Sequence, residues 1–356
     1  MSEKRIMSIK KYLKEQFVLH PSMMPSDVAK LCYQAAMGAE HLLTDTEGAR
    51  RYFEAELSSV EERRCPMIEQ ISDDVIRIDL GAWKAKGLPG EWLFNMFCAS
   101  ACYRSDGKSR LAEYLSEAEE TLKKAERQFS DNEWQVFVDD YINKGMPAIH
   151  HSALYRQYEK PSYRIVDARF LSVIPILEKI SCKSDGVTVI SFDGRAASGK
   201  STLAGILATV TEASIIKMDD FFLPNELRTE KRLKEAGGNI HYERFVSEIL
   251  PYLRGNVPFE YGMFDCGKMK ISGKRAVKPS NVRIVEGSYS QHPLFGDYSD
   301  ISVFVTVSAK EQRRRILERN GEALAKMFAD MWIPMEESYF EAFGIKEKSD
   351  IVISTD

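Results

Sequence analysis

The sequence has few features that would place the chain outside ordinary globular proteins. Its six cysteines include no pair in CxxC spacing, so the ligand pattern of a zinc ribbon and the motif of a redox dithiol are both missing. The two nearest cysteines, Cys98 and Cys102, lie four residues apart in a segment expected to be helical. We therefore expect buried, reduced thiols rather than a disulfide framework or a zinc site.

Neither sign of charge dominates the chain. Lysine and arginine number 49 and aspartate and glutamate 53, and the net charge of −4 gives no general attraction to nucleic acid or to an anionic membrane. No apolar run is long enough to span a bilayer, and residues 1–17 carry charges without the apolar core of a signal peptide. The sequence predicts a cytoplasmic protein without nucleic acid or membrane partners, and it leaves self-association into a homo-oligomer open.

What the chain does contain is a phosphate-binding motif. Residues 187–192 are mostly β-branched or aromatic, as in a buried strand, and residues 202–208 have helical character. Between them stands GRAASGKS, which fits GxxxxGK[ST] at every fixed position. A chance match is disfavoured because strand, loop and helix follow in the required order. The predicted nucleotide site comprises Gly194, Arg195, Ala196, Ala197, Ser198, Gly199, Lys200, Ser201 and Thr202.

The chemistry of phosphate binding explains this spacing. Glycine at Gly194 and Gly199 lets the loop turn, so that backbone N–H groups point at a phosphate chain near a helix N-terminus. Lys200 can reach the β- and γ-phosphates, and the Ser201 hydroxyl can bind Mg²⁺. The sequence therefore predicts ATP and Mg²⁺ as cofactors.

Residues 1–182 are expected to form a mostly helical domain. Apolar residues at helical spacing run from Leu111 to Phe129, and Ser130 with Glu133 forms a capping box that opens a second helix, which ends before Gly145. An earlier helix is expected over residues 26–43. Residues 75–80 alternate like a short strand, which is a weak signal when it stands alone.

Polar side chains in this half allow two interpretations. Arg77, Arg156 and Arg164 could gather around an anion in a second site. Helix caps, solvated charges and core histidines explain the same residues more simply. A metal site from His41 with His150 or His151 lacks a supporting spacing.

A polar, glycine-terminated segment at residues 181–186 marks the expected boundary between domains 1–182 and 183–356. Beyond it, short apolar strands alternate with helices, which predicts a parallel sheet covered on both faces. A charged helix is expected near residues 226–236, and residues 256–280 are expected to be polar and irregular. The expected strands after the first are residues 213–218, 282–285, 301–307 and 350–354.

Carboxylates follow two of these strands. Asp219 and Asp220 come directly after the second strand, and Glu286 ends the third. Open α/β sheets bind ligands at the carboxyl ends of their strands, so these acids are expected near the phosphate loop.

The second half resembles the uridine kinase-like branch of the P-loop kinases, which also contains phosphoribulokinase and bacterial pantothenate kinase. The resemblance covers about half of the chain. It rests on GRAASGKS, MDDFF, IVEGSY and RRRILERNG with a late WIPMEESYF, in that order. It implies a five-stranded parallel P-loop sheet with a helical lid, and a kinase that phosphorylates a small molecule.

The resemblance also implies roles for individual residues. Asp219 would face the acceptor hydroxyl, Asp220 and Glu286 would support Mg²⁺ with Ser201, and Arg315 or Arg319 of the lid would contact the phosphates beside Lys200. The acceptor would enter between the lid and four residues, Asp219, Phe222, His241 and Tyr261.

Two departures from the family pattern leave the acceptor open. His241 stands where uridine kinases usually have an acid, and the arginine pattern of the lid is one residue longer and lacks its acid. A nucleoside is the first expectation and another hydroxylated metabolite is close behind. Two alternatives remain: a nucleotide-dependent switch whose helical half binds a partner, and a bifunctional enzyme with a second site in that half.

Overall fold

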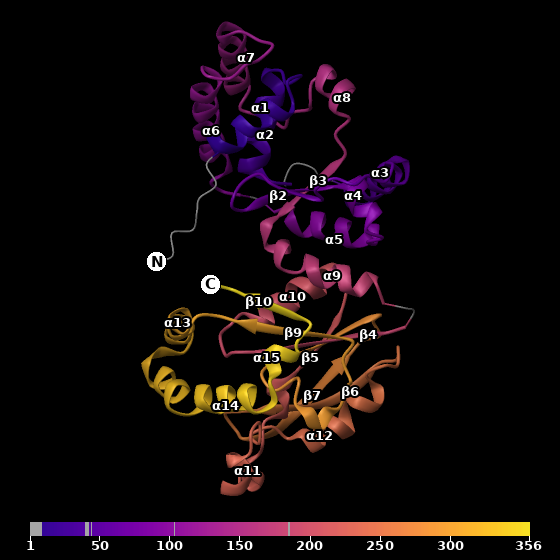
Figure 1. Ribbon diagram of the computed structural model, residues 1–356, viewed down its shortest axis with the longest axis vertical. Helices are drawn as coiled ribbons and strands as arrows, with labels where there is room; N and C mark the ends of the chain where they lie inside the picture. Colours follow the sequence, from indigo (N-terminus) through magenta and orange to yellow (C-terminus); the bar gives the residue numbers. More distant parts are fainter. Residues whose placement is uncertain (1–8, 40–42, 44, 103, 184–185) are drawn as a thin grey trace. The chain divides into compact units, whose positions relative to one another are not determined.

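The structure is a computed structural model, and it describes residues 9–39, 43, 45–102, 104–183 and 186–356 (Figure 1). The chain forms two compact units, Met1–Leu171 and Ser172–Asp356. The second unit begins before the expected boundary at residue 182. It includes helix α9, Ile174–Ser181, whose Lys179 pairs with Asp350 at 3.6 Å.

The first unit is helical around a small antiparallel sheet of three strands in the order β1-β2-β3. The expected strand at residues 75–80 is confirmed as β2, and it gains partners on both sides that the sequence did not predict. The elements are α1 Ile9–Leu19, α2 Pro25–Met37, α3 Thr46–Ser59, β1 Ile68–Gln70, β2 Val75–Asp79, α4 Leu80–Ala85, α5 Gly90–Ser100, α6 Gly107–Leu122, α7 Asp131–Asn143, α8 Ala153–Glu159 and β3 Tyr163–Asp167.

In this unit, one helix boundary predicted from the sequence is confirmed and two are wrong. The Ser130–Glu133 capping box is present and opens α7. Helix α6 ends at Leu122, before the expected Phe129, and α2 ends at Met37 because Gly38 follows with φ +64°. His41, considered as a metal ligand, lies outside the described residues.

The second unit contains a five-stranded parallel sheet in the order β10-β9-β4-β8-β5, with the strand of the phosphate loop at its centre. Every residue of β4 and β8 is buried, which accounts for their nearly continuous apolar sequences. The elements are β4 Thr188–Gly194, α10 Lys200–Thr211, β5 Ser214–Lys217, α11 Glu230–Lys234, α12 Tyr242–Glu248, β6 Phe259–Asp265, β7 Lys270–Val277, β8 Val282–Glu286, β9 Ile301–Thr306, α13 Ala309–Met327, α14 Ile333–Phe343, α15 Ile345–Lys348 and β10 Ile351–Ser354.

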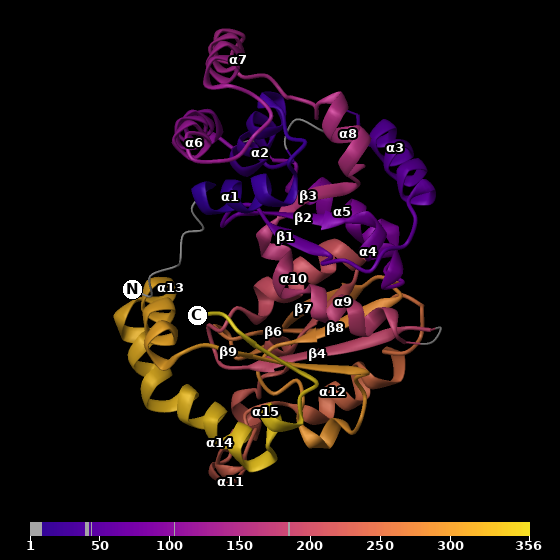
Figure 2. The same ribbon diagram turned by 45° about the horizontal axis from the view of Figure 1, so that its top comes forward.

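Helices cover both faces of this sheet. Helices α9 and α10 lie on one face, and α12, α14 and α15 lie on the other (Figures 1 and 2). On the second face, Phe245 of α12 and Phe340 of α14 share a buried cluster with Phe304 of β9. The expected fold of the second half, a five-stranded parallel P-loop sheet with flanking helices after a mostly helical domain, is confirmed.

Three expectations were wrong. Residues 256–280 are not irregular: they form the antiparallel hairpin of β6 and β7, whose Phe259 and Tyr261 join the buried cluster. The thiols are free, but only Cys32 is buried; Cys98 is half-buried and the other four are exposed. The charged helix expected at residues 226–236 is shorter in the structure, where α11 spans only Glu230–Lys234.

The structure also limits two kinds of assignment. No helix within the described ranges has the length and apolarity needed to cross a membrane. In the same part of the chain, no three His, Cys, Asp or Glu side chains gather as a preformed metal site.

Candidate active site

The loop between β4 and α10 requires glycine at both of its ends. Gly194 has φ +129° and Gly199 has φ +91°. A Cβ on Gly194 would lie 2.0 Å from the Val305 carbonyl oxygen, which belongs to the neighbouring strand β9 and cannot move aside. Arg195 N–H donates to the same Val305 carbonyl at 3.2 Å. The loop therefore passes over the edge of the sheet at a distance that only glycine permits.

The inner side of the loop offers donors to an anion. The first N–H groups of α10, from Lys200 onward, have no acceptor within the helix, and the helix dipole adds positive potential there. Ser198 is fully buried, and its Oγ has no hydrogen-bond partner among the described residues. An unpaired buried hydroxyl costs free energy unless a ligand accepts from it. The loop therefore fits a phosphate group.

Lys200 lies across the loop that it follows. Its Nζ donates to the carbonyls of Gly194 at 2.6 Å and Arg195 at 2.8 Å, and to Ser288 Oγ at 3.3 Å. The side chain is buried, so its charge acts in a region of low polarity. Thr202, the last residue of the predicted nucleotide site, is exposed on the first turn of α10.

Ser201 and Glu286 meet beside this lysine. Ser201 Oγ donates to Glu286 Oε2 at 3.0 Å, which joins the first turn of α10 to the end of β8. Burial raises the pKa of the Glu286 carboxyl, while the Ser201 hydrogen bond and the charge of Lys200 oppose that rise. A hydroxyl and a single carboxylate beside a phosphate loop are a suitable partial ligand set for Mg²⁺, which completes its shell with phosphate oxygens and water.

Asp219 belongs to the same group of charges. It lies in a 3₁₀ turn, Met218–Phe221, directly after β5. Surrounding protein raises the pKa of its carboxyl, and the charge of Lys200 opposes this. Its side chain still reaches solvent, so we expect water to sustain the ionised form at neutral pH. Glu286 adds to the negative potential at this point, because the two carboxyls interact electrostatically.

The neighbouring Asp220 faces elsewhere. Its carboxylate accepts from Arg275 Nε at 2.7 Å and from the Tyr261 hydroxyl at 3.2 Å, both from the β6–β7 hairpin. The arginine and the tyrosine both donate to Asp220 Oδ2, so this oxygen is already occupied. These contacts give Asp220 a structural role in anchoring the hairpin to the turn that carries Asp219, while its expected metal role stays a prediction.

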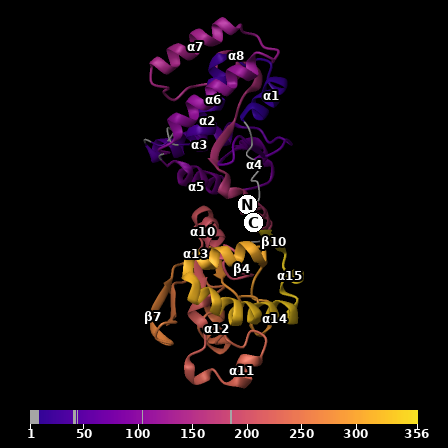
Figure 3. The same ribbon diagram turned by 90° about the vertical axis from the view of Figure 1, so that its left-hand side faces the viewer.

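The two lid arginines also have different partners. Arg315 donates to the backbone carbonyls of Ala197 and Thr355 and to Thr355 Oγ1, so it ties the loop to the end of β10. Arg319 is exposed, its Nε donates to Asn320 Oδ1 at 2.9 Å, and its positive charge opposes the rise in the pKa of Asp219. Gly321 follows with φ +75° and interrupts α13. Figure 3 shows the chain continuing into α14 along the same flank.

The residues expected around the acceptor are only partly gathered. Tyr261 is buried, and its hydroxyl accepts from Lys217 N–H at 3.1 Å, so it supports the turn rather than lining an opening. The side chain of His241 caps α12 and lies 3.1 Å from Glu243. Phe222 is half-buried and forms a β-bridge with Ile240.

Sequence reasoning missed a set of residues that hold the loop from outside. Asp193 is fully buried and accepts from the N–H groups of Gly194 and Tyr289 and from the Tyr339 hydroxyl. Glu336 of α14 accepts from Ala196 N–H at 2.9 Å and from Ser288 Oγ at 2.6 Å.

The adjacent Glu337 completes this contact by pairing with Arg195 at 2.7 Å. Helix α14 is thus fixed directly to the phosphate loop. The segments IVEGSY and WIPMEESYF contain Ser288, Tyr289, Glu336, Glu337 and Tyr339, but no spacing in the sequence links them to the loop.

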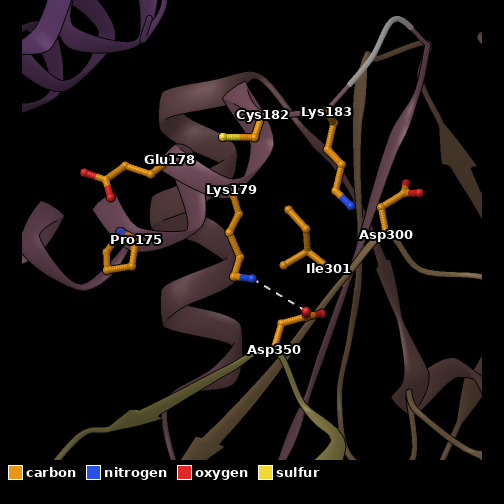
Figure 4. A pocket seen from close by; sticks show the side chains of 8 residues that line it. All are labelled: Pro175, Glu178, Lys179, Cys182, Lys183, Asp300, Ile301 and Asp350. Atoms are coloured by element: carbon orange, nitrogen blue, oxygen red, sulfur yellow. Dashed lines mark ion pairs between the residues drawn. The ribbon is translucent and has the colours of Figure 1, made fainter. Parts of the chain in front are cut away.

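A separate hollow of about 520 Å³ lies at the opposite edge of the sheet, where the strands begin (Figure 4). Lys179 of α9 and Asp350 before β10 form an ion pair in its wall. The hollow is remote from the carboxyl ends of the strands, where the phosphate loop and Asp219 lie. We therefore place the candidate chemistry at the loop and not in this hollow.

No family model matches the chain, and no curated protein does. Among solved structures, the chain is similar to a possible uridine kinase from Bacillus stearothermophilus, with 20% identity, a TM-score of 0.39, and coverage of 49% of this chain and 92% of that one. It is also similar to a proposed fructose transport system kinase from Silicibacter sp. TM1040, with 22% identity, a TM-score of 0.41, and coverage of 50% and 95%.

A third similar structure is TT1252 from Thermus thermophilus, with 16% identity, a TM-score of 0.29, and coverage of 48% and 90%. Each of these three similarities covers about half of this chain. The P-loop fold itself is established by the sheet order and the loop of this chain.

Proposed function

We propose that the C-terminal unit transfers the terminal phosphoryl group of ATP to a hydroxyl of a small metabolite. The observation that carries this proposal is the convergence of four side chains at one edge of the sheet. Lys200 and Ser201 open α10, Glu286 ends β8, and Asp219 follows β5. A binding site for nucleotide alone does not need the fourth residue, Asp219, a carboxylate that interacts electrostatically with Lys200.

The chain's own groups would hold the nucleotide in a defined way. The loop N–H groups and Ser198 Oγ would donate to phosphate oxygens, and Lys200 Nζ would exchange its loop carbonyls for the β- and γ-phosphates. Ser201 and Glu286 would hold Mg²⁺, directly or through water. When bound, the metal supplies neutralisation of charge on the phosphate oxygens.

Asp219 would act on the acceptor. Its carboxylate would accept a hydrogen bond from the acceptor hydroxyl and take its proton as the oxygen bonds to the γ-phosphorus. The bond from the γ-phosphorus to the bridging oxygen breaks, and ADP leaves with that oxygen. The raised pKa of Asp219 makes it a better proton acceptor than a fully solvated aspartate. Holding the hydroxyl in line supplies much of the rate.

Arg319 would complete the site from the lid. Its charge acts at Asp219, and Arg319 lies in the first part of α13, before the break at Gly321. With nucleotide bound, the guanidinium would stabilise charge that develops on the transferred group. Arg315 would instead maintain the shape of the loop, because its donors are already taken by Ala197 and Thr355.

The acceptor class follows from the resemblance and from the residues near the turn. A nucleoside is our first proposal, and another hydroxylated metabolite is the second. His241 and Phe222 lie at the β-bridge beside the Asp219 turn and would face the acceptor. A histidine there can donate to or accept from hydroxyls, whereas an acid would only accept.

The test is acceptor-dependent release of ADP from Mg·ATP. The full chain is assayed with a panel of nucleosides, pantothenate and sugars, and the phosphorylated product is identified by mass spectrometry. We expect one class to raise ADP release at least a hundredfold over the rate without acceptor. ADP release that no acceptor stimulates would contradict the proposal and favour a nucleotide-dependent switch.

A further inference from the structure

The N-terminal unit contains a buried series of hydrogen-bonded side chains that none of the expected functions requires. Arg77 Nη2 donates to Gln34 Oε1 at 2.6 Å, and Gln34 Nε2 donates to the Tyr163 hydroxyl at 3.0 Å. Tyr163 then contacts His151 Nε2 at 2.7 Å, and His151 Nδ1 contacts Asp27 at 3.0 Å. All five side chains are largely buried.

The partners fix the state of His151. An ionised aspartate only accepts, so Nδ1 carries the proton and Nε2 accepts from the Tyr163 hydroxyl. Burial lowers the pKa of His151 to about 4, so the ring is neutral at physiological pH. These hydrogen bonds hold His151 and Tyr163 in place, because neither side chain can rearrange without breaking buried contacts.

His151 also lines a hollow of about 460 Å³ within the N-terminal unit. This volume is in the range of small-molecule sites. Its wall combines basic residues with one aromatic ring and one acid, and it comprises Lys30, Tyr52, Glu56, His150, His151, Arg156, Lys160, Pro161 and Ser162.

The charges in this wall do not balance. Glu56, the one acid in the wall, forms an ion pair with Arg164 at 2.6 Å. Lys30 Nζ donates to the neutral carbonyl of Ile149 at 3.0 Å, and Arg156 Nε donates to the carbonyl of His151 at 3.0 Å. Among the described residues, no carboxylate lies within ion-pair distance of Lys30, Arg156 or Lys160. Three cations therefore share one hollow without a direct ion pair, and Asp27 acts on Lys30 only as a nearby negative charge.

We propose that this hollow binds the phosphate group of a small organic phosphomonoester. Lys30, Arg156 and Lys160 bind the phosphate, and the organic part lies against the ring of Tyr52, which is 70% exposed. Arginine supports this assignment because its planar donors match phosphate oxygens in pairs. Arg77 and Arg164, two members of the anion site considered from the sequence, are instead structural: they pair with Glu69 and Glu56.

The electrostatics of Lys30 support an anion site. Burial, together with the charges of Arg77 and Arg156, lowers the pKa of Lys30 to about 8, and the charge of Asp27 opposes this shift. A phosphate beside Nζ would favour the charged ammonium and relieve the repulsion from both arginines. Binding near pH 8 should therefore take up a proton, which calorimetry detects as a dependence of the binding heat on the ionisation heat of the buffer.

The test uses the full chain carrying Lys200→Met, so that the phosphate loop does not compete for the probe. Phenyl phosphate, phenol and inorganic phosphate are titrated by isothermal calorimetry at low salt. We expect phenyl phosphate to bind, phenol not to bind, and Lys30→Met or Arg156→Gln to weaken binding at least tenfold. Lys124→Met, at an exposed lysine of the same unit, should leave the affinity unchanged.

Three results would overturn the proposal. One is phenyl phosphate affinity that neither Lys30→Met nor Arg156→Gln changes. Another is equal binding of phenol, which would show that the phosphate is not recognised. The last is a set of titrations in which inorganic phosphate binds and phenyl phosphate does not. If Lys30→Met fails to fold, Arg156→Gln and Lys160→Met decide the outcome, because both side chains are exposed.

Discussion

Ser201 Oγ and Glu286 Oε2 lie 3.0 Å apart, although 85 residues separate them in the chain. Their hydrogen bond brings the only carboxylate at the end of β8 to the first turn of α10. Within the C-terminal unit, this pair is the arrangement best suited to hold Mg²⁺ against phosphates on the loop. Its two members can be tested separately from the loop itself.

Glu286→Gln should reduce the phosphoryl transfer rate by about 100-fold and raise the Mg²⁺ concentration needed for half-maximal rate. The substitution preserves shape and the hydrogen bond from Ser201 but removes the negative charge. The measurement is the initial rate over a range of free Mg²⁺. Glu337→Gln, also near the loop but paired with Arg195, is the control and should keep the Mg²⁺ requirement. An unchanged Mg²⁺ requirement in Glu286→Gln would remove Glu286 from the metal site.

Gly194→Ala should abolish nucleotide binding and destabilise the C-terminal unit. Its Cβ would meet the Val305 carbonyl oxygen at 2.0 Å, and φ +129° is strained for alanine by roughly 1–3 kcal/mol before that clash is counted. Gly205→Ala in α10, the helix that follows the loop, is the matched control. Nothing lies within 4 Å of its added Cβ, and the unit should gain about 0.5–1 kcal/mol. Urea unfolding of both variants tests the pair, and equal stabilities would contradict the loop geometry.

Arg315 and Arg319 should separate into a structural and a functional arginine. Arg319→Gln should lower the transfer rate about 10- to 100-fold with little change in thermal stability, because the side chain is exposed and, in the proposed mechanism, stabilises the transferred group. Arg315→Gln should lower thermal stability, because it breaks the contacts to Ala197 and Thr355. Thermal unfolding and steady-state kinetics on both variants decide. A reversed pattern would move the catalytic role to Arg315.

His151 should make the N-terminal unit sensitive to acid. Its pKa is lowered from 6.5 to about 4 in the folded state, and burial is the largest cause. The stabilisation is therefore complete above pH 6.5 and is lost as pH falls through 4, because the unfolded ring takes up a proton in that window and the folded ring does not. Imidazole NMR signals assigned with His151→Asn should titrate near pH 4. A midpoint near 6.5 would contradict the burial of the His151 ring.

The phosphate loop could be predicted from the sequence because its requirements are local. Gly194, Lys200 and Ser201 are fixed by a turn and a helix start within eight residues, and the apolar strands around them are buried on both faces. The order of strands and helices then led to a parallel sheet. These features depend on neighbouring residues and on hydrophobic pattern, both of which are visible in the sequence.

The contacts that the sequence did not reveal join distant segments. Strand β3 pairs Ile165 with Arg77, and Glu336 reaches Ala196 across 140 residues. The β6–β7 hairpin was missed because β7 exposes nearly all of its residues and has no apolar alternation. The resemblance assigned Asp219 to the acceptor and Asp220 to Mg²⁺, and it did not reveal the partners Arg275 and Tyr261 that hold Asp220.

The most direct test of the central claim compares ATP binding and phosphoryl transfer in Asp219→Asn. In this variant, ATP affinity measured by calorimetry should stay within about threefold of the unmodified chain, while acceptor-dependent ADP release falls at least a thousandfold. Lys200→Met should lose both. If Asp219→Asn retained full transfer with the best acceptor, the carboxylate would have no part in the chemistry, and the proposed kinase site would be wrong.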